Sequence, residues 1–169
     1  MERWDVYDST GKRTGKTKTR ADVWNHDEYH LGVSLWLWNE NAQVLIQKRS
    51  ATKRIYPNIW CNVCGSAMAG ETSKAACVRE AREEIGLVVD PCQITFLGRT
   101  IKQNNMYDDY ALHSDFPIEQ FRFPLDEVSE LRWVSLDEID ELFRRKAFLL
   151  DDPSELDNLK NHIRNYKKA

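Results

Sequence analysis

The sequence lacks any apolar run that approaches the ~20 residues of a membrane-spanning helix. Its first residues, MERWDVYDSTGKR, also lack the apolar core of a secretory signal peptide. We therefore expect a cytoplasmic protein with no membrane partner. No internal repeat, low-complexity tract or linker divides the 169 residues, a length that fits one domain with a sizeable core. We expect residues 1–169 to form a single domain.

A strong excess of either charge is also absent. The chain has 24 basic and 27 acidic residues and a net charge of −3, which gives no overall attraction to nucleic acid. We therefore expect no nucleic-acid polymer as a partner. A local basic run near the N-terminus is typical of a solvated face, with a rim that steers an anionic substrate as the alternative. Its members are Lys12, Arg13, Lys16, Lys18 and Arg20.

Cysteine is scarce, with four residues in the chain. Cys61 and Cys64 form a CxxC pair, but neither a second CxxC nor a histidine pair follows at zinc-finger spacing. Cys77 falls in a predicted helix, where a small buried thiol is the usual role. We therefore expect free thiols in a reducing compartment rather than a zinc or redox site.

The most specific feature that is present is a motif of the form G-x5-E-x7-R-E-x2-E-E-x-G. Because each residue type occurs at roughly 5–10% in ordinary sequences, seven fixed positions rarely coincide by chance. The motif predicts a loop, a helix from about Ser73 to Ile85, and a left-handed glycine that ends the helix. Its fixed positions are Gly65, Glu71, Arg79, Glu80, Glu83, Glu84 and Gly86.

Three glutamates of the motif, Glu80, Glu83 and Glu84, share one face of the predicted helix. Glutamate-rich helix faces are usually solvated surface, but Gly65 and Glu71 upstream favour a metal site. A hard cation such as Mg²⁺ or Mn²⁺ prefers oxygen ligands and would neutralise the like charges. Such a metal binds a diphosphate, stabilises charge on phosphoryl oxygens and activates a water molecule.

Other polar residues are candidates for supporting roles. Arg79 is placed to pair with Glu71, which would hold the loop against the helix and leave the other glutamates free for metal. Cationic side chains complement phosphoryl charge, and Lys48, Arg49 and Lys53 are the candidates. His30 begins an apolar strand, where a histidine is usually hydrogen-bonded and partly buried, and contact with the substrate is the alternative.

The order of predicted elements indicates an α+β domain or a mixed-sheet sandwich, because strands and helices mix without regular βαβ alternation. Ser135 and Glu138 form a capping-box signature for a helix to about Lys146, and Asp152 with Pro153 opens a last helix. The predicted strands are Trp4–Tyr7, His30–Trp38, Val44–Lys48, Ile59–Cys64, Gln93–Ile101, Tyr107–Phe116 and Leu131–Val134.

The motif resembles the Nudix box in every fixed letter. This resemblance implies an α/β/α sandwich around a mixed sheet, with the box at residues 65–87 as loop–helix–loop. It also implies a Mg²⁺- or Mn²⁺-dependent hydrolase of a small-molecule diphosphate, in which water attacks phosphorus and a P–O–P bond breaks. A homodimer would be ordinary for such a protein. The sequence does not identify the substrate.

The resemblance also assigns roles within the box. Glu80 and Glu84 would bind metal, Glu83 would be a further ligand or a water-positioning base, and the Gly65 carbonyl would coordinate. Glu71 and Arg79 would form the supporting pair. Many Nudix enzymes take their catalytic base from a later loop or strand, and the candidates here are Asp108, Asp109, Asp126 and Glu127.

Residues outside the box resemble the subgroup similar to isopentenyl-diphosphate isomerase, which is the alternative function. Cys64 falls where the isomerase has its cysteine. His30 matches one upstream histidine, but Val23 and Ser66 stand where the isomerase has other histidines. The intact box also favours hydrolysis. A non-catalytic nucleotide-binding module is a third possibility, because fold does not fix function.

Overall fold

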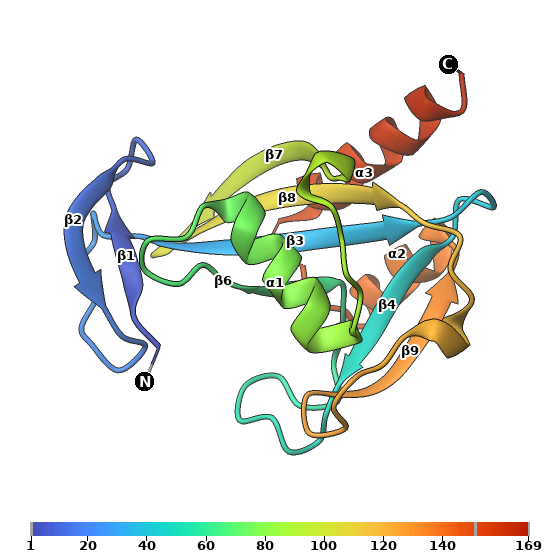
Figure 1. Ribbon diagram of the computed structural model, residues 1–169, viewed down its shortest axis with the longest axis horizontal. Helices are drawn as coiled ribbons and strands as arrows, with labels where there is room; N and C mark the ends of the chain where they lie inside the picture. Colours follow the sequence, from blue (N-terminus) through green and yellow to red (C-terminus); the bar gives the residue numbers. More distant parts are fainter. Residues whose placement is uncertain (1, 151, 169) are drawn as a thin grey trace.

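A seven-stranded mixed sheet forms the centre of the protein (Figure 1). The structure is a computed structural model that describes residues 2–150 and 152–168. Its strands are β1 (Trp4–Tyr7), β2 (Arg13–Lys18), β3 (His30–Trp38), β4 (Val44–Arg49), β5 (Trp60–Cys61), β6 (Val63–Ser66), β7 (Thr95–Lys102), β8 (Asn105–His113) and β9 (Val128–Val134). Its helices are α1 (Ser73–Ile85), α2 (Leu136–Arg144) and α3 (Pro153–Tyr166), with short 3-10 turns η1 (Pro91–Gln93) and η2 (Ile118–Gln120).

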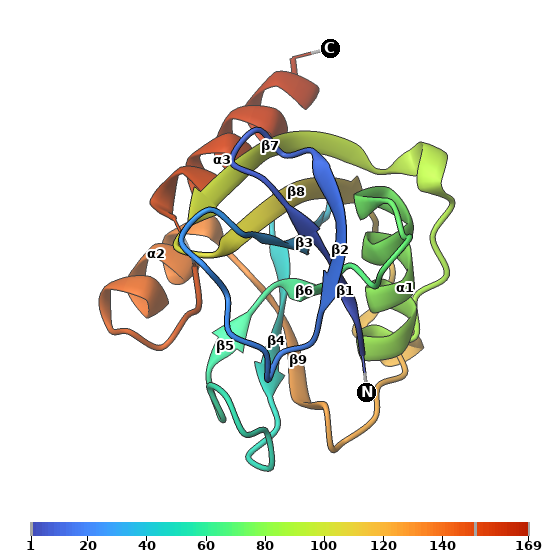
Figure 2. The same ribbon diagram turned by 90° about the vertical axis from the view of Figure 1, so that its left-hand side faces the viewer.

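The sheet has the strand order β5-β4-β3-β8-β7, with β6 on β3 and β9 on β4. The β3–β8 pair is parallel and the other pairs are antiparallel. Helix α1 covers one face, and α2 with α3 covers the other (Figure 2). The α/β/α sandwich with a mixed sheet is therefore confirmed.

Strand β3 is buried on both faces, which explains its nearly continuous apolar sequence HLGVSLWLW. Leu35 and Leu37 belong to the core under α1. Trp36 and Trp38 point the other way, into the core under α2 and α3. The alternation of side chains along one strand thus links both halves of the core.

Helix ends follow the expected local chemistry. The side chain of Ser135 accepts a hydrogen bond from the Glu138 amide at the start of α2. Asp152 and Glu155 form a reciprocal capping box at the start of α3, with Pro153 as the first helical residue. Helix α2 ends at Arg144, two residues before the predicted end, and Lys146 has a left-handed φ of 57°. No helix within the described residues is long and apolar enough to cross a membrane.

Two sequence predictions need correction. The predicted strand Ile59–Cys64 is two strands, because the chain leaves the ladder at Asn62, so that β5 pairs with β4 and β6 pairs with β3. Strand β2 was missed because its sequence RTGKTK is polar and mostly exposed, and only its pairing with β1 reveals it. This break between β5 and β6 matters because the candidate site lies between β4 and β6.

Candidate functional site

The box folds as a loop followed by helix α1, with the predicted bounds Ser73–Ile85. The Thr72 hydroxyl caps the helix by accepting a hydrogen bond from the Ala75 amide at 3.2 Å. Gly86 ends it with a φ of 69°, and a Cβ there would lie 2.4 Å from the Arg122 carbonyl oxygen. Both the backbone angle and the close packing therefore require glycine at this position.

Arg79 fastens the loop to the helix. Its Nε donates to Glu71 Oε1 and its Nη2 to Glu71 Oε2, both at 2.9 Å. Nη2 also donates to the Ser66 carbonyl oxygen at 2.8 Å. The hydrogen bond from Arg79 lowers the pKa of Glu71, so this carboxylate stays charged. The predicted pair is present, in the bidentate geometry that fixes both partners.

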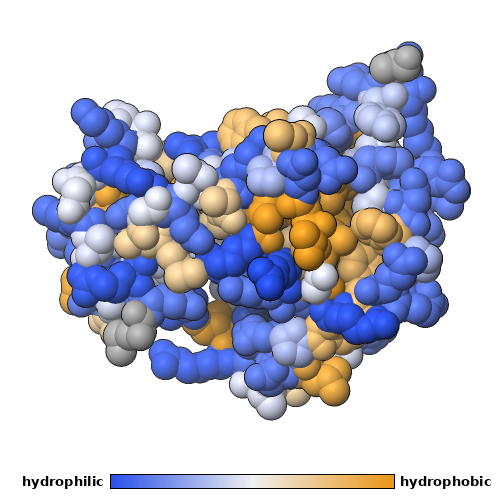
Figure 3. Space-filling view, in the orientation of Figure 1, coloured by the Kyte–Doolittle hydropathy of each residue, from blue (hydrophilic) through white to orange (hydrophobic). Residues whose placement is uncertain are grey.

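The remaining nitrogen of the guanidinium reaches two further glutamates. Arg79 Nη1 donates to Glu80 Oε1 at 2.8 Å and to Glu83 Oε2 at 3.0 Å. The Glu83 side chain is 57% exposed. Figure 3 shows hydrophilic side chains (blue) next to apolar ones (orange) over the region of α1. One arginine therefore gathers three of the four box carboxylates around itself.

Gly65 makes room for the Glu80 carboxylate. A Cβ at Gly65 would lie 2.0 Å from Glu80 Cδ and 2.2 Å from its nearer oxygen. No other residue could occupy this position without displacing the carboxylate. Burial raises the pKa of Glu80 in spite of the opposing effect of Arg79. The close approach also brings the carboxylate against the main chain of β6.

Glu84 is the deeply buried acid of the box, with 7% of its surface exposed. Its Oε2 accepts hydrogen bonds from Gln47 Nε2 at 2.6 Å and from the Cys64 amide at 3.1 Å. Burial, with a contribution from the nearby Glu80, raises the pKa of Glu84 to about 7. Gln47 Nε2 also donates to the Asn62 carbonyl oxygen at 3.1 Å. The Gln47 side chain therefore lies between β4 and β6.

Sequence reasoning missed Gln47. Its signal was a single amide within the otherwise apolar start of β4, VLIQKR. Gln47 is 2% exposed, and a buried amide needs hydrogen-bond partners. A buried amide in an apolar strand therefore indicates a polar site beside that strand.

The donor set fits a hard divalent cation. Glu84 is buried, and the Glu80 side chain is 14% exposed. The charge of Glu80 raises the pKa of Glu84, and a cation would offset this repulsion. The glycine at position 65 lets backbone approach Glu80 closely, and the neighbouring Cys64 amide donates to Glu84. Within residues 2–150 and 152–168, no three acidic, cysteine or histidine side chains already converge around one point. Arg79 holds Glu80 and Glu83 to itself in this arrangement.

The predicted phosphate-binding cations separate into two groups. Lys53 pairs with Glu127, and its pKa is lowered by burial and by Arg49, while Glu84 opposes this shift. Arg49 also lowers the pKa of Glu84, so both cations interact electrostatically with the box, while Arg49 Nε donates to the Ile55 carbonyl oxygen at 3.2 Å. Lys48 lies over the Trp60 ring at 5.7 Å, and Trp60 belongs to the core on the α2–α3 side. The structure does not bring Lys48 to the box.

His30 lies away from the box, in a cluster of aromatic rings. It stacks on Trp4 with ring centroids 4.6 Å apart and lies edge-on to Trp24 at 5.8 Å. Burial lowers the pKa of His30 to about 4, so the ring is neutral at physiological pH. These contacts place it below the β1–β2 hairpin rather than beside the box glutamates.

The four candidate bases also occupy different environments. Asp108 is buried and accepts two hydrogen bonds from Arg99, at 2.5 and 2.8 Å. Asp109 is fully buried. Asp126 and Glu127 lie in the turn before β9, and both act on Lys53, which is also close to Glu84. These two acids are thus the candidates that the fold brings toward the box.

The four cysteines are free. A hydrogen bond from Cys61, together with burial, raises the pKa of Cys64. The Cys64 side chain is therefore a protonated thiol, and its backbone amide makes the contact with Glu84.

Comparison with known proteins gives consistent results. Residues 28–152 match the NUDIX domain family. The chain is 34% identical over 151 residues to an uncharacterized Nudix hydrolase of Listeria monocytogenes, covering 88% of this chain and 89% of that one. It is 31% identical over 113 residues to an isopentenyl-diphosphate Delta-isomerase of Klebsiella pneumoniae, covering 63% and 61%.

Among solved structures, the fold is similar to that of the DR0079 protein from Deinococcus radiodurans. The TM-score is 0.74 and the sequence identity 24%, with 95% of this chain and 98% of that chain covered. At this level of identity the likeness concerns the fold alone.

Proposed function

This chain belongs to the Nudix hydrolase family, and we propose that it is a Mg²⁺- or Mn²⁺-dependent hydrolase of a nucleoside diphosphate-X type small molecule. The observation that carries the proposal is the pair of box carboxylates, the partly buried Glu80 and the buried Glu84, with Gly65 placed so that any Cβ would collide with Glu80. Water attacks one phosphorus of the diphosphate and the P–O–P bond breaks.

Glu80 and Glu84 would hold the metal, with the Gly65 carbonyl and Glu83 as further ligands. When bound, the metal supplies charge stabilisation at phosphoryl oxygens and a more acidic water molecule. Gln47 orients Glu84 by its hydrogen bond at 2.6 Å. The Arg79–Glu71 pair keeps the Gly65–Glu71 loop against the helix. These contacts fix the ligands before the substrate arrives, which lowers the cost of binding.

The cations near the box complement the substrate. Arg49 and Lys53 lie on the side of Glu84, where they would attract the phosphoryl groups and stabilise their charge. Asp126 or Glu127 would accept the proton of the attacking water. Release of Glu127 from Lys53 when a phosphate engages that lysine would free its carboxylate for this role.

Support for the isomerase alternative is weaker. The similarity to isopentenyl-diphosphate isomerases covers a smaller share of both chains than the similarity to Nudix hydrolases.

A screen for released phosphate, pyrophosphate and phosphomonoesters, separated by ion-exchange chromatography, tests the proposal. The panel contains nucleoside diphosphates and triphosphates, nucleotide sugars, dinucleoside polyphosphates, coenzyme A and isopentenyl diphosphate, each with Mg²⁺, Mn²⁺ or EDTA. Glu84→Gln is the inactivated variant, and Glu119→Gln removes one exposed carboxylate from η2 as a matched control. We expect metal-dependent release from one class, lost with Glu84→Gln and kept with Glu119→Gln. Conversion of isopentenyl diphosphate to its dimethylallyl isomer without phosphate release would contradict the proposal.

A further inference from the structure

A hollow of about 400 Å³ lies outside the box, between the N-terminal hairpin and the loop after β4. Its lining residues are Glu2, Trp4, Arg20, Ala21 and Arg54. We call it the Trp4 hollow. Two arginines against one glutamate give it a net positive charge, although the whole chain is acidic. A positively charged concavity on an acidic protein concentrates anionic ligands.

The hollow offers two guanidinium groups as hydrogen-bond donors. Among the described residues, neither Arg20 nor Arg54 forms an ion pair, whereas Arg13 and Lys18 of the same basic run pair with carboxylates. A guanidinium carries five N–H donors and no acceptor, so a ligand that supplies oxygen acceptors is the matching chemistry.

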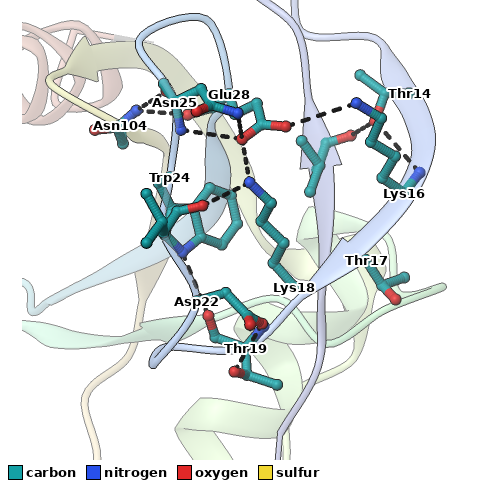
Figure 4. A network of polar contacts seen from close by, with 12 residues as sticks. Thr14, Lys16, Thr17, Lys18, Thr19, Asp22, Trp24, Asn25, Glu28 and Asn104 are labelled. Atoms are coloured by element: carbon teal, nitrogen blue, oxygen red, sulfur yellow. Dashed lines mark hydrogen bonds and ion pairs between the residues drawn. The ribbon is translucent and has the colours of Figure 1, made fainter.

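The segment that carries Arg20 is held rigidly by polar contacts (Figure 4). Thr19 donates to Asp22 Oδ2 through its amide at 2.6 Å and through its hydroxyl at 2.9 Å. The preceding residue, Lys18, pairs with Glu28 and donates to the Val23 carbonyl at 2.7 Å. Arg20 is thus in the middle of a fixed turn, which reduces the entropy cost of binding a ligand there.

Main-chain contacts place the Trp4 hollow beside the box loop. The Arg3 carbonyl oxygen, next to Trp4 in the chain, accepts a hydrogen bond from the Ala69 amide at 2.8 Å, and Asp5 Oδ2 accepts one from the Gly70 amide at 2.8 Å. Because residues 69 and 70 belong to the loop between Gly65 and Glu71, the strand that carries Trp4 adjoins the box. Arg54, in the loop after β4, lines the hollow from the other side.

The Trp4 ring itself is not available for stacking by a substrate base. His30 stacks on it at 4.6 Å, the Arg20 guanidinium lies over it at 5.3 Å, and only 4% of the residue is exposed. What the hollow presents is the two guanidinium groups, whose planar forks match phosphate or carboxylate oxygens.

We propose that the Trp4 hollow binds a further anionic group of the substrate, so that the preferred substrates carry a third phosphate beyond the diphosphate at the box. This inference rests on the proposed function, because it assigns a specificity role to Arg20 and Arg54 for the same reaction. Substrates whose diphosphate ends in a neutral group would leave the two arginines unused.

Titration calorimetry with inorganic tripolyphosphate and pyrophosphate tests the proposal. Measurements with Mg²⁺ use the imido analogues of both probes, whose P–N–P links resist hydrolysis, so that the diphosphate part meets the metal-loaded box without turnover. The wild-type chain is expected to bind tripolyphosphate about tenfold more tightly, the scale of one charge-assisted contact. The double variant Arg20→Gln/Arg54→Gln should lose this preference and retain pyrophosphate binding. Arg144→Gln, which removes an exposed charge from α2, should keep the preference.

The possible outcomes distinguish the role of the Trp4 hollow from the proposed hydrolase function. An unchanged preference in the double variant, or no preference in the wild-type chain, would overturn the role of the Trp4 hollow. Adenosine binding that disappears in the double variant would also overturn it, in favour of a base-binding site. The unfolding midpoint checks that the double variant is folded. Absence of diphosphate turnover with Mg²⁺ or Mn²⁺ would refute the proposed function and leave the binding preference for the longer probe intact.

Discussion

Replacement of Glu84 by Gln should remove catalysis and at the same time stabilise the metal-free protein at alkaline pH. Glu84 is buried, and its pKa is raised from 4.5 to about 7. A glutamine keeps the same shape, and its carbonyl oxygen can still accept hydrogen bonds from Gln47 and from the Cys64 amide, which now bind Glu84 Oε2. The variant therefore removes a buried charge while leaving the packing in place.

The magnitude follows from the two pKa values. A carboxyl group whose pKa is higher in the folded state holds its proton more tightly there, so the free energy of unfolding falls as pH rises between 4.5 and about 7. With about 1.4 kcal/mol for each pKa unit, ionisation of Glu84 costs the folded state about 3 kcal/mol above this range. Below pH 4.5 the carboxyl is protonated in both states and this cost vanishes.

Urea unfolding of the wild-type chain and Glu84→Gln, both in EDTA, measures the effect. We expect Glu84→Gln to be more stable by about 3 kcal/mol at pH 8 and by little at pH 4. Added Mg²⁺ should stabilise the wild-type chain and have little effect on the variant, because a ligand of the folded state raises stability by mass action. Equal stability at pH 8, or a difference independent of pH, would refute the claim of a buried, destabilising charge.

Three further substitutions test other parts of the site. Gly65→Ala places a Cβ 2.0 Å from Glu80 Cδ, so kcat should fall on the order of 100-fold in the phosphate-release assay, and unchanged kcat would contradict the close approach. Arg79→Lys removes the bidentate pairing with Glu71, and turnover should fall roughly 10- to 100-fold while circular dichroism stays native. Cys64→Ser should leave hydrolysis unchanged, since Cys64 contributes its backbone amide, whereas a large loss would point to a reactive thiol.

The box could be predicted from the sequence because its information is local. The helix Ser73–Ile85, its left-handed glycine and the Glu71–Arg79 pair all follow from spacing within one short segment. The sandwich fold was also predictable, since strands such as β3 carry continuous apolar sequence.

Features that depend on tertiary structure were harder to predict. The break at Asn62 arises because two different strands pair with the segments on either side of it. Lys48 and Arg49 are adjacent in sequence, but alternation along β4 sends Lys48 to the Trp60 side of the sheet. Strand β2 is polar and depends on its partner β1. No sequence pattern within the segment itself predicts any of these three features.

Binding of Mn²⁺, followed by the electron paramagnetic resonance signal of the free ion during parallel turnover assays, tests the central claim most directly. The account predicts that the wild-type chain and Glu119→Gln bind Mn²⁺ and that hydrolysis rises in step with occupancy. Glu80→Gln should weaken binding and reduce turnover together. Mn²⁺ binding and turnover in Glu80→Gln equal to those of the wild-type chain would contradict the assignment of the box carboxylates as the metal site.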